Sequence, residues 1–236
     1  MKRIKKITIQ QIIEFLGKDL LQVHGETKGV FIDHLADVEN TNETTLDWIN
    51  PSKPNKQDIA EKSKAKVILV DSSIDYSSEL QTQKKILLVV DNPKFQLAKI
   101  GNHFFVEKIT PIIHPTAIID SQSKIGKDVY IGPYTVIGRS LIGDGCFIDS
   151  NVRIHDDVTL GTDCVVKSGA VLGGEGFGFE KDEYGNRFRF PQIGGLIIGN
   201  NVEIGSNTTI DRGALSDTVI GDYTKISNMC HIAHNN

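Results

Sequence analysis

The chain lacks the features that mark several classes of protein. Its formal net charge is −4 and its isoelectric point is near 6.0, so no basic field is available to hold a nucleic-acid backbone. No stretch approaches the roughly 20 consecutive apolar residues that a membrane-spanning helix needs. The basic start, residues 1–6, is followed by Thr8-Ile9-Gln10-Gln11 instead of the apolar core of a secretory signal. Three cysteines without the spacing of a disulfide framework are typical of a reducing compartment, so we expect a cytoplasmic protein.

What the sequence does contain is a six-residue repeat from about Ile113 to its last residue. Each unit opens with an aliphatic residue, and all 17 opening positions hold Ile, Leu or Val. These positions are 113, 119, 125, 131, 137, 142, 148, 154, 160, 166, 172, 198, 204, 210, 220, 226 and 232. A single unit cannot bury its apolar residue, so successive coils must stack and share one core. The repeat therefore predicts a hexapeptide-repeat β-helix over residues 111–236.

The fifth position of the units is small or β-branched almost throughout, as at Val152 and Ala170. Such a residue packs beside the aliphatic one near the corner of a coil. All three cysteines, Cys146, Cys164 and Cys230, fall at this position. We interpret them as small buried hydrophobic residues and not as catalytic thiols.

Two interruptions break the period. Residues 173–197 are glycine-rich at first and then polar and aromatic, and Glu183-Tyr184-Gly185-Asn186 is typical of the turn of a hairpin. A long excursion from a regular solenoid predicts a role in binding or assembly. The second interruption, residues 214–217, adds four residues and predicts a small bulging turn.

Residues 1–110 follow different rules and predict a small α/β domain. Thr8 to Gly17 has the pattern of a capped amphipathic helix that ends at glycine. Residues 66–70 and 86–90 are apolar runs typical of buried strands. Asn92-Pro93 leads into a predicted helix over residues 95–105.

Two histidines near the chain's end are the strongest candidates for chemistry. His231 and His234 occupy the sixth and third positions of their units, and both positions face away from the core of a coil. Histidine is the side chain best matched to proton transfer near neutral pH. A zinc site would need a third ligand, and His155 is the one outward candidate in the helix body. That spacing does not favour a metal, so none is predicted.

Four sequence blocks carry a resemblance to a known family. They are residues 174–179 (GEGFGF), 191–194 (PQIG), 209–214 (TIDRGA) and 231–235 (HIAHN). With them the chain resembles the UDP-3-O-(3-hydroxyacyl)glucosamine N-acyltransferases of lipid A biosynthesis. The blocks stand in the family's order, and the similarity covers almost the whole chain.

The resemblance implies an architecture and a reaction. It implies a homotrimer of left-handed parallel β-helices, preceded by an N-terminal domain that binds uridine. The donor is acyl carrier protein that bears a 3-hydroxyacyl chain as a phosphopantetheine thioester, and the acceptor is the 2-amino group of a UDP-linked 3-O-acylglucosamine. His234 is the general base of this scheme, and neither a metal nor a bound cofactor is required.

The resemblance also implies a set of substrate-binding residues. They are Trp48, Asn50, Gly176, Phe177, Asn228, His231 and Asn235. Trp48 would offer a stacking face for the uracil ring, although a place in the core explains it equally well. Backbone amides near the glycine-rich segment would stabilise the oxyanion.

Several departures from the family pattern leave alternatives open. Ser227 stands where the family carries an aspartate, and the stretch around Trp48 lacks the family's tyrosine. These changes favour, as one alternative, an acetyl- or acyl-coenzyme A dependent sugar-nucleotide acyltransferase. The stop shortly after His234 favours, as another, a non-catalytic trimeric scaffold. Because the sequence stops at Asn236 in the middle of a coil, we expect either a fragment or a shortened relative.

Overall fold

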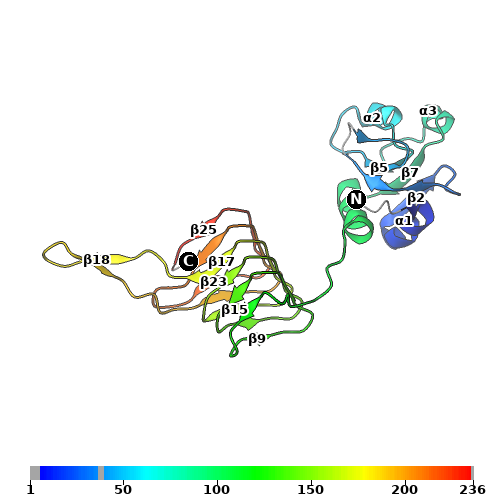
Figure 1. Cartoon of the computed structure of the whole chain (residues 1–236). Helices are drawn as coiled ribbons and strands as arrows, with labels where there is room; N and C mark the ends of the chain where they lie inside the picture. The colour runs from blue at the N-terminus through cyan, green and yellow to red at the C-terminus, as the bar shows by residue number, and fades with distance from the viewer. Residues whose placement is uncertain (1–5, 37–39, 235–236) are drawn as a thin grey trace. The chain divides into compact units, whose positions relative to one another are not determined.

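Separate hydrophobic cores divide the chain into two units, Met1–Lys108 and Ile109–Asn236 (Figure 1). The boundary lies two residues before the one that the sequence suggests. The computed structural model describes residues 6–36 and 40–234. Within the described residues, no helix is long and apolar enough to cross a membrane.

A five-stranded sheet organises the N-terminal unit. Its order is β2-β7-β6-β5-β4, with β2 antiparallel to β7 and the other pairs parallel. The strands are β2 (Leu20–His24), β4 (His34–Leu35), β5 (Thr45–Trp48), β6 (Val67–Val70) and β7 (Ile86–Val90), and a separate pair joins β1 (Ile7–Thr8) to β3 (Phe31–Ile32). Every residue of β6 and β7 is buried, which confirms the two predicted strands.

Helices enclose this sheet on both sides. They are α1 (Ile9–Leu16), α2 (Lys56–Lys62), α3 (Ser78–Thr82) and α4 (Pro93–Ile100), with a 3₁₀ turn at Gly17–Asp19 and a π-helical turn at Gly101–Phe105. Alternate residues of β6 enter two cores: Val67 and Leu69 pack with α1, whereas Ile68 and Val70 pack with α2 and α3. Burial on both faces explains why the central strands are continuously apolar.

The helix termini follow from local capping. Thr8 and Gln11 form a capping box at the start of α1, and Gly17 ends it with φ of 50°, as the sequence predicts. Helix α4 begins two residues earlier than predicted. The Asn92 side chain accepts a hydrogen bond from Phe95 N, and Pro93 suits the first helical turn because it needs no N–H there.

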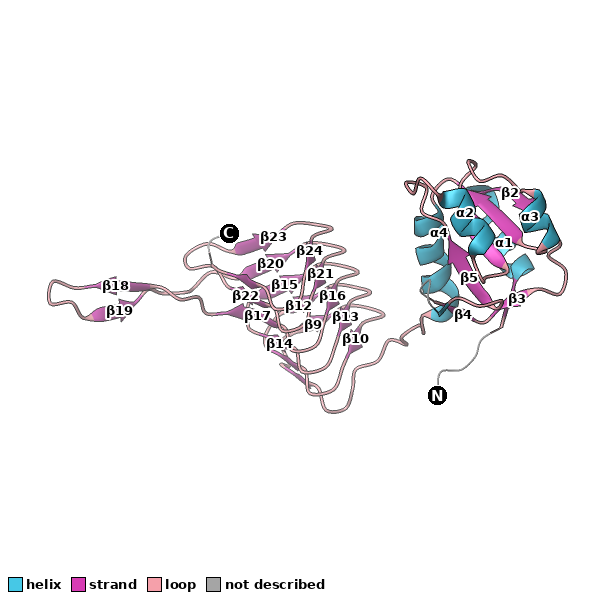
Figure 2. Cartoon of the chain, turned by 90° about the horizontal axis from the view of Figure 1, so that it is seen from above, coloured by secondary structure: helices cyan, strands magenta, loops and turns pink. Residues whose placement is uncertain are grey.

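The second unit is a left-handed parallel β-helix, as predicted, and its strands form three sheets. One sheet has the order β10-β13-β16-β21-β24, one β25-β22-β17-β14-β11-β8 and one β23-β20-β15-β12-β9 (Figure 2). The strands are β8 (Ile118–Ile119), β9 (Lys124–Ile125), β10 (Tyr130–Ile131), β11 (Val136–Ile137), β12 (Leu141–Ile142), β13 (Phe147–Ile148), β14 (Arg153–Ile154), β15 (Val158–Leu160), β16 (Val165–Val166), β17 (Val171–Gly174), β20 (Leu196–Ile198), β21 (Glu203–Ile204), β22 (Thr209–Asp211), β23 (Thr218–Ile220), β24 (Lys225–Ile226) and β25 (His231–Ile232).

The opening residues of the units form the interior of this β-helix. Twelve of the 17 are buried, and Ile119, Ile125, Ile226 and Ile232 of the outer coils pack against them. Ile113, at the first coil, is exposed. Successive coils are in register, so Phe147 pairs with Val165 three units later.

The cysteines occupy the corners predicted for them. Cys146 and Cys164 are fully buried, and each Sγ donates to a glycine carbonyl 3.0 Å away. The hydrogen bond with Cys164 and burial raise the pKa of the Cys146 thiol. Cys230, in the last described coil, is partly exposed, so the prediction of burial is wrong for this residue. The arrangement agrees with a packing role for the buried pair.

The long interruption forms a hairpin that projects from the β-helix (Figure 2). Strands β18 (Phe179–Lys181) and β19 (Arg187–Arg189) pair antiparallel, and every residue of both is exposed. Asp182 Oδ1 accepts hydrogen bonds from Tyr184 N and Asn186 N, which closes the predicted turn. The shorter interruption is a bend between β22 and β23.

Replacing an opening residue of a unit should destabilise the β-helix. Ile204 is fully buried, and Ile204→Ala is expected to lower the free energy of unfolding by about 2–5 kcal/mol because it leaves a cavity. Denaturant unfolding of the β-helix unit measures the change. Ile118→Ala, on the outer face of β8, is the matched control and should cost under about 0.5 kcal/mol. Equal losses in the two variants would contradict the assignment of the core.

Candidate functional site

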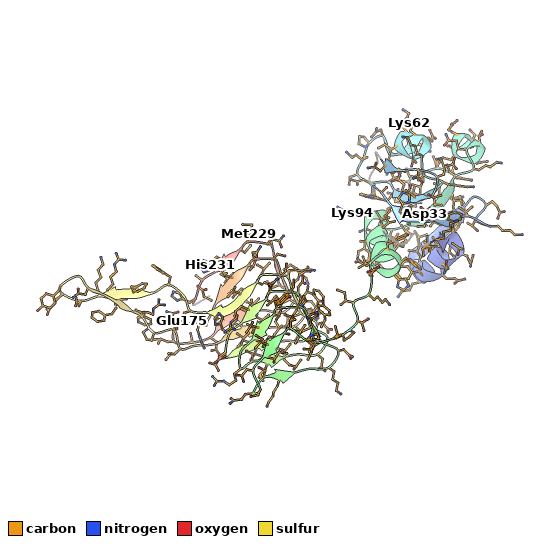
Figure 3. The ribbon with its side chains drawn as sticks, in the orientation of Figure 1. Asp33, Lys62, Lys94, Glu175, Met229 and His231 are labelled. Carbon is orange, nitrogen blue, oxygen red and sulfur yellow. The ribbon has the colours of Figure 1, made fainter. Side chains whose placement is uncertain are left out.

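Stacking of the last coils brings distant sequence blocks onto neighbouring strands. In the six-stranded sheet, β17 pairs with β22 and β22 pairs with β25. Gly174 lies opposite Asp211, and Thr209 lies opposite His231. The glycine-rich block, the TIDRGA block and the histidine block are therefore adjacent at the last coils of the β-helix. Figure 3 shows His231 on β25 and Glu175 at the base of the hairpin.

A bulge starts the chain's departure into the hairpin. The register between β17 and β22 shifts between Leu172 and Gly174. Gly173 has φ of 77°, and a Cβ there would lie 2.5 Å from Cγ2 of Val158. Only glycine tolerates both conditions, so Gly173 permits the bulge that turns residues 174–178 toward the last coil.

His234 packs against the glycine-rich segment. Gly176 is buried, and a Cβ built on it would lie 2.4 Å from Cδ2 of His234 and 2.9 Å from Oε1 of Gln192. The absence of a side chain at Gly176 thus makes room for both groups. His234 is half-buried as a result, although it lies outside the aliphatic interior.

Two residues that lie beside Gly176 each have a buried polar atom without a hydrogen-bond partner among the described residues. These atoms are Nδ1 of His234 and Oε1 of Gln192. The Nε2 of Gln192 donates to the carbonyl of Phe190, which holds the amide in place. Orphaned buried polar atoms are costly, and their accumulation at one place is typical of a functional site.

The position of His234 in its coil is usually filled by a structural residue. At the same third position Asn228 Oδ1 accepts from Ser206 N at 2.7 Å, and Asp222 Oδ1 accepts from Asn200 N at 2.6 Å. The equivalent N–H beneath His234 belongs to Arg212, and it donates instead to the carbonyl of Gly174. His234 therefore does not accept the backbone hydrogen bond that Asn228 and Asp222 accept at the same position of their units.

His231 has a carboxylate partner. Its Nε2 lies 3.0 Å from Oδ2 of Asp211. The Asp211 side chain is 13% exposed and that of His231 is 59% exposed. The imidazole of His231 is therefore exposed to solvent, and the nearly buried carboxylate of Asp211 fixes its orientation.

Arg212 anchors the segments around the site. Its Nε donates to the Gly194 carbonyl at 2.6 Å and its guanidinium pairs with Asp157 at 3.2 Å. Hydrogen bonds from Arg139 and then from Arg212 lower the pKa of Asp157. The cluster ties the returning end of the hairpin segment to the β-helix.

His155 lies on the same sheet, beside Gly173 and Gly174. Burial, followed by the nearby charges of Arg153 and Arg212, lowers the pKa of its imidazole. The parts of the chain that the structure describes contain no group of three His, Cys, Asp or Glu side chains placed to hold a metal.

The remaining predicted residues are spread over both units. Trp48 ends β5 and packs, partly buried, against the core beneath α1 and α4, which favours the packing explanation. Asn50 is exposed in the turn after β5, where its Oδ1 accepts from Ser52 N. Phe177 is 81% exposed and stacks edge-on with Phe179. Asn228 holds the structural hydrogen bond given above, and its role toward substrate stays a prediction.

Asn235 was predicted to bind substrate, whereas Gln192 and Asp211 were not. Asn235 lies outside the described residues. Asp211 contacts His231, and Gln192 lies beside Gly176 as His234 does, yet the sequence alone gave neither residue a role. Both stand within the blocks that carried the resemblance, which was the one signal that pointed to them.

Comparison with known proteins identifies the family. Residues 139–174 match the model "Bacterial transferase hexapeptide (six repeats)". A UDP-3-O-acylglucosamine N-acyltransferase of Polynucleobacter asymbioticus is 31% identical over 94% of this chain and 70% of that protein. One from Pseudomonas syringae pv. tomato is 38% identical over 97% of this chain and 68% of that protein.

Solved structures resemble parts of the chain. A UDP-N-acetylglucosamine acyltransferase of Francisella novicida is 26% identical, with a TM-score of 0.46. The match covers 52% of this chain and 44% of that protein's chain. A UDP-N-acetylglucosamine O-acyltransferase of Moraxella catarrhalis is 30% identical with a TM-score of 0.46, over 52% of this chain and 46% of its own. The chain thus spans less than half the length of these structures.

The sequence relatives decide the assignment, since they match nearly all of this chain and more than two thirds of their own lengths. The chain is an acyltransferase and belongs to the family of UDP-3-O-acylglucosamine N-acyltransferases.

Proposed function

We propose that this protein transfers a 3-hydroxyacyl chain from acyl carrier protein to the 2-amino group of a UDP-linked 3-O-acylglucosamine, with His234 as general base. The proposal rests on membership in the family and on one observation. His234 is packed against Gly176 with its Nδ1 buried. Its other ring nitrogen, Nε2, is then the atom that a substrate would meet.

Gln192 supports a basic Nε2. Oε1 of Gln192 and Nδ1 of His234 are both buried and lack partners among the described residues, and the proposal has them hydrogen-bonded to each other in the substrate complex. That bond selects the tautomer in which Nε2 is unprotonated and able to accept a proton. Gln192 would act here as a positioning residue.

The reaction then follows from proton and charge balance. The sugar amine attacks the thioester carbonyl while Nε2 of His234 takes a proton from the nitrogen. The carbonyl oxygen gains negative charge, and backbone amides of residues 174–178 are the donors proposed to stabilise it. Collapse of the intermediate forms the amide and expels the phosphopantetheine thiol, so no covalent enzyme intermediate is involved.

We further propose that three copies assemble through the β-helix. The five-stranded sheet that contains β23 carries an outward row of exposed apolar residues, Leu141, Ile197 and Val219. Such a row fits burial against a neighbouring copy. The cytoplasm is the proposed compartment, which fits three cysteines that are unpaired.

Removing the base should slow the reaction strongly. His234→Ala is expected to lower kcat by about 10²–10⁴-fold, because a positioned general base contributes that much. Transfer of a radiolabelled 3-hydroxyacyl chain to the UDP-linked amino sugar measures it, with protein made from the complete reading frame. His114→Ala, which removes an imidazole at the first coil, should keep the wild-type rate. Equal activity in all three proteins, or efficient acetyl transfer from coenzyme A without carrier protein, would sink the proposal.

Filling the space at Gly176 should displace His234. In Gly176→Ala the new Cβ would overlap the imidazole, so kcat is expected to fall at least about tenfold while the melting temperature changes little. Gly221→Ala is the control, because a Cβ at Gly221 meets nothing within 4 Å. A fully active Gly176→Ala variant would mean that the packing of His234 on Gly176 is irrelevant to catalysis.

Charging the apolar row should dissociate the assembly. Ile197→Lys combined with Val219→Lys is expected to convert trimer to monomer, since like charges would face a buried interface. Light scattering after gel filtration gives the mass. Lys124→Glu, at the end of the same row, is the control and should leave the trimer intact. A wild-type monomer would contradict the proposed assembly.

A further inference from the structure

His231 is a second imidazole at the same site, and its contacts differ from those of His234. Its Nε2 is 3.0 Å from Oδ2 of Asp211, whereas His234 lies against a glycine and an amide. Because a carboxylate accepts hydrogen bonds, Nε2 of His231 carries the proton in this contact. Among the described residues Nδ1 of His231 has no hydrogen bond, so it is the nitrogen that remains for a ligand.

Asp211 is placed to hold His231 firmly. It pairs with Gly174 across the bulge of the six-stranded sheet, and its side chain is nearly buried. When His231 gains a second proton, the Asp211 carboxylate offsets the charge of the ring. The same combination of acid and imidazole orients histidines in many hydrolases.

Both histidines adjoin the same short segment. Asp211, the partner of His231, lies against Gly174, and His234 lies against Gly176. The two imidazoles are three residues apart, on β25 and the turn that follows it. A substrate bound along the glycine-rich segment would therefore have both histidines close to it.

The proposed acyl transfer needs a proton at two places. The N–C bond forms and the nitrogen loses a proton, while the C–S bond breaks and the departing sulfur must gain one. A neutral thiol departs more readily than an alkyl thiolate, so a general acid at sulfur accelerates the collapse. Enzymes commonly use two titratable groups in different surroundings, one as the general acid and the other as the general base.

We propose that His231, oriented by Asp211, is the general acid that protonates the leaving sulfur, while His234 serves as the base. This inference rests on the proposed function. Nδ1–H of His231 gives its proton to the sulfur as the C–S bond breaks, and Asp211 keeps Nε2 protonated throughout. The proton that His234 takes from nitrogen returns to solvent, and solvent restores the proton on His231.

The test varies the leaving group. His231→Gln keeps a hydrogen bond to Asp211 but cannot deliver a proton. With the carrier-protein thioester, this variant should lose about 10²-fold or more in kcat. With a thiophenol ester of the same acyl chain, whose thiolate leaves unaided, it should approach the wild-type rate on that donor. Asp211→Asn should show the same pattern with a smaller loss.

Control variants distinguish the acid role of His231 from the proposed acyl transfer with His234 as base. His234→Ala should be impaired with both donors, because its role lies at the nitrogen. Melting temperatures of the variants check that folding is unchanged. A His231→Gln variant that loses activity equally with both donors, or loses none, would overturn the acid role while leaving His234 as base. Absence of transfer by the wild-type protein would overturn both.

Discussion

The stacking of coils in register is the constraint on which the whole second unit depends. Each coil donates backbone hydrogen bonds to the next, and each adds one aliphatic residue per face to a shared column. Neither contribution is available to a coil in isolation, because its backbone would be unpaired and its apolar residue exposed. The register thus decides which side chains enter the core and which reach the surface.

A site in such a solenoid has to be made by breaking its regularity. Flat walls of short strands offer no concave place for a substrate. At Gly173 the chain leaves the coil through a bulge, and Gly176 comes back against the last described turn with Gln192 beside it. The half-buried state of His234 is a consequence of that excursion, as are the two orphaned polar atoms beside it.

The same geometry gives two histidines different surroundings within three residues. His231 points outward from a strand and meets the carboxylate of Asp211, whereas His234 sits on a turn beside Gly176. Arg212 connects these surroundings, because its N–H to Gly174 relieves His234 of a structural hydrogen bond. Division of proton-transfer work between the two rings is a consistent extension of the acyltransferase chemistry of this family.

Sequence alone determined the repeat, the aliphatic interior, the buried cysteine pair, the hairpin and the buried strands of the first unit. Each of these rests on a pattern of near neighbours, such as a period of six or a capped run like that of α1. Only the tertiary structure decided that Gln192 and Asp211 belong to the site and that Asn228 accepts a backbone hydrogen bond. Those contacts join residues about 20 to 60 positions apart, and they exist only after coils have stacked and the excursion has returned. The periodicity of the sequence predicts whether a side chain points into the core or outward. The packing of the whole unit decides which distant residue that side chain contacts.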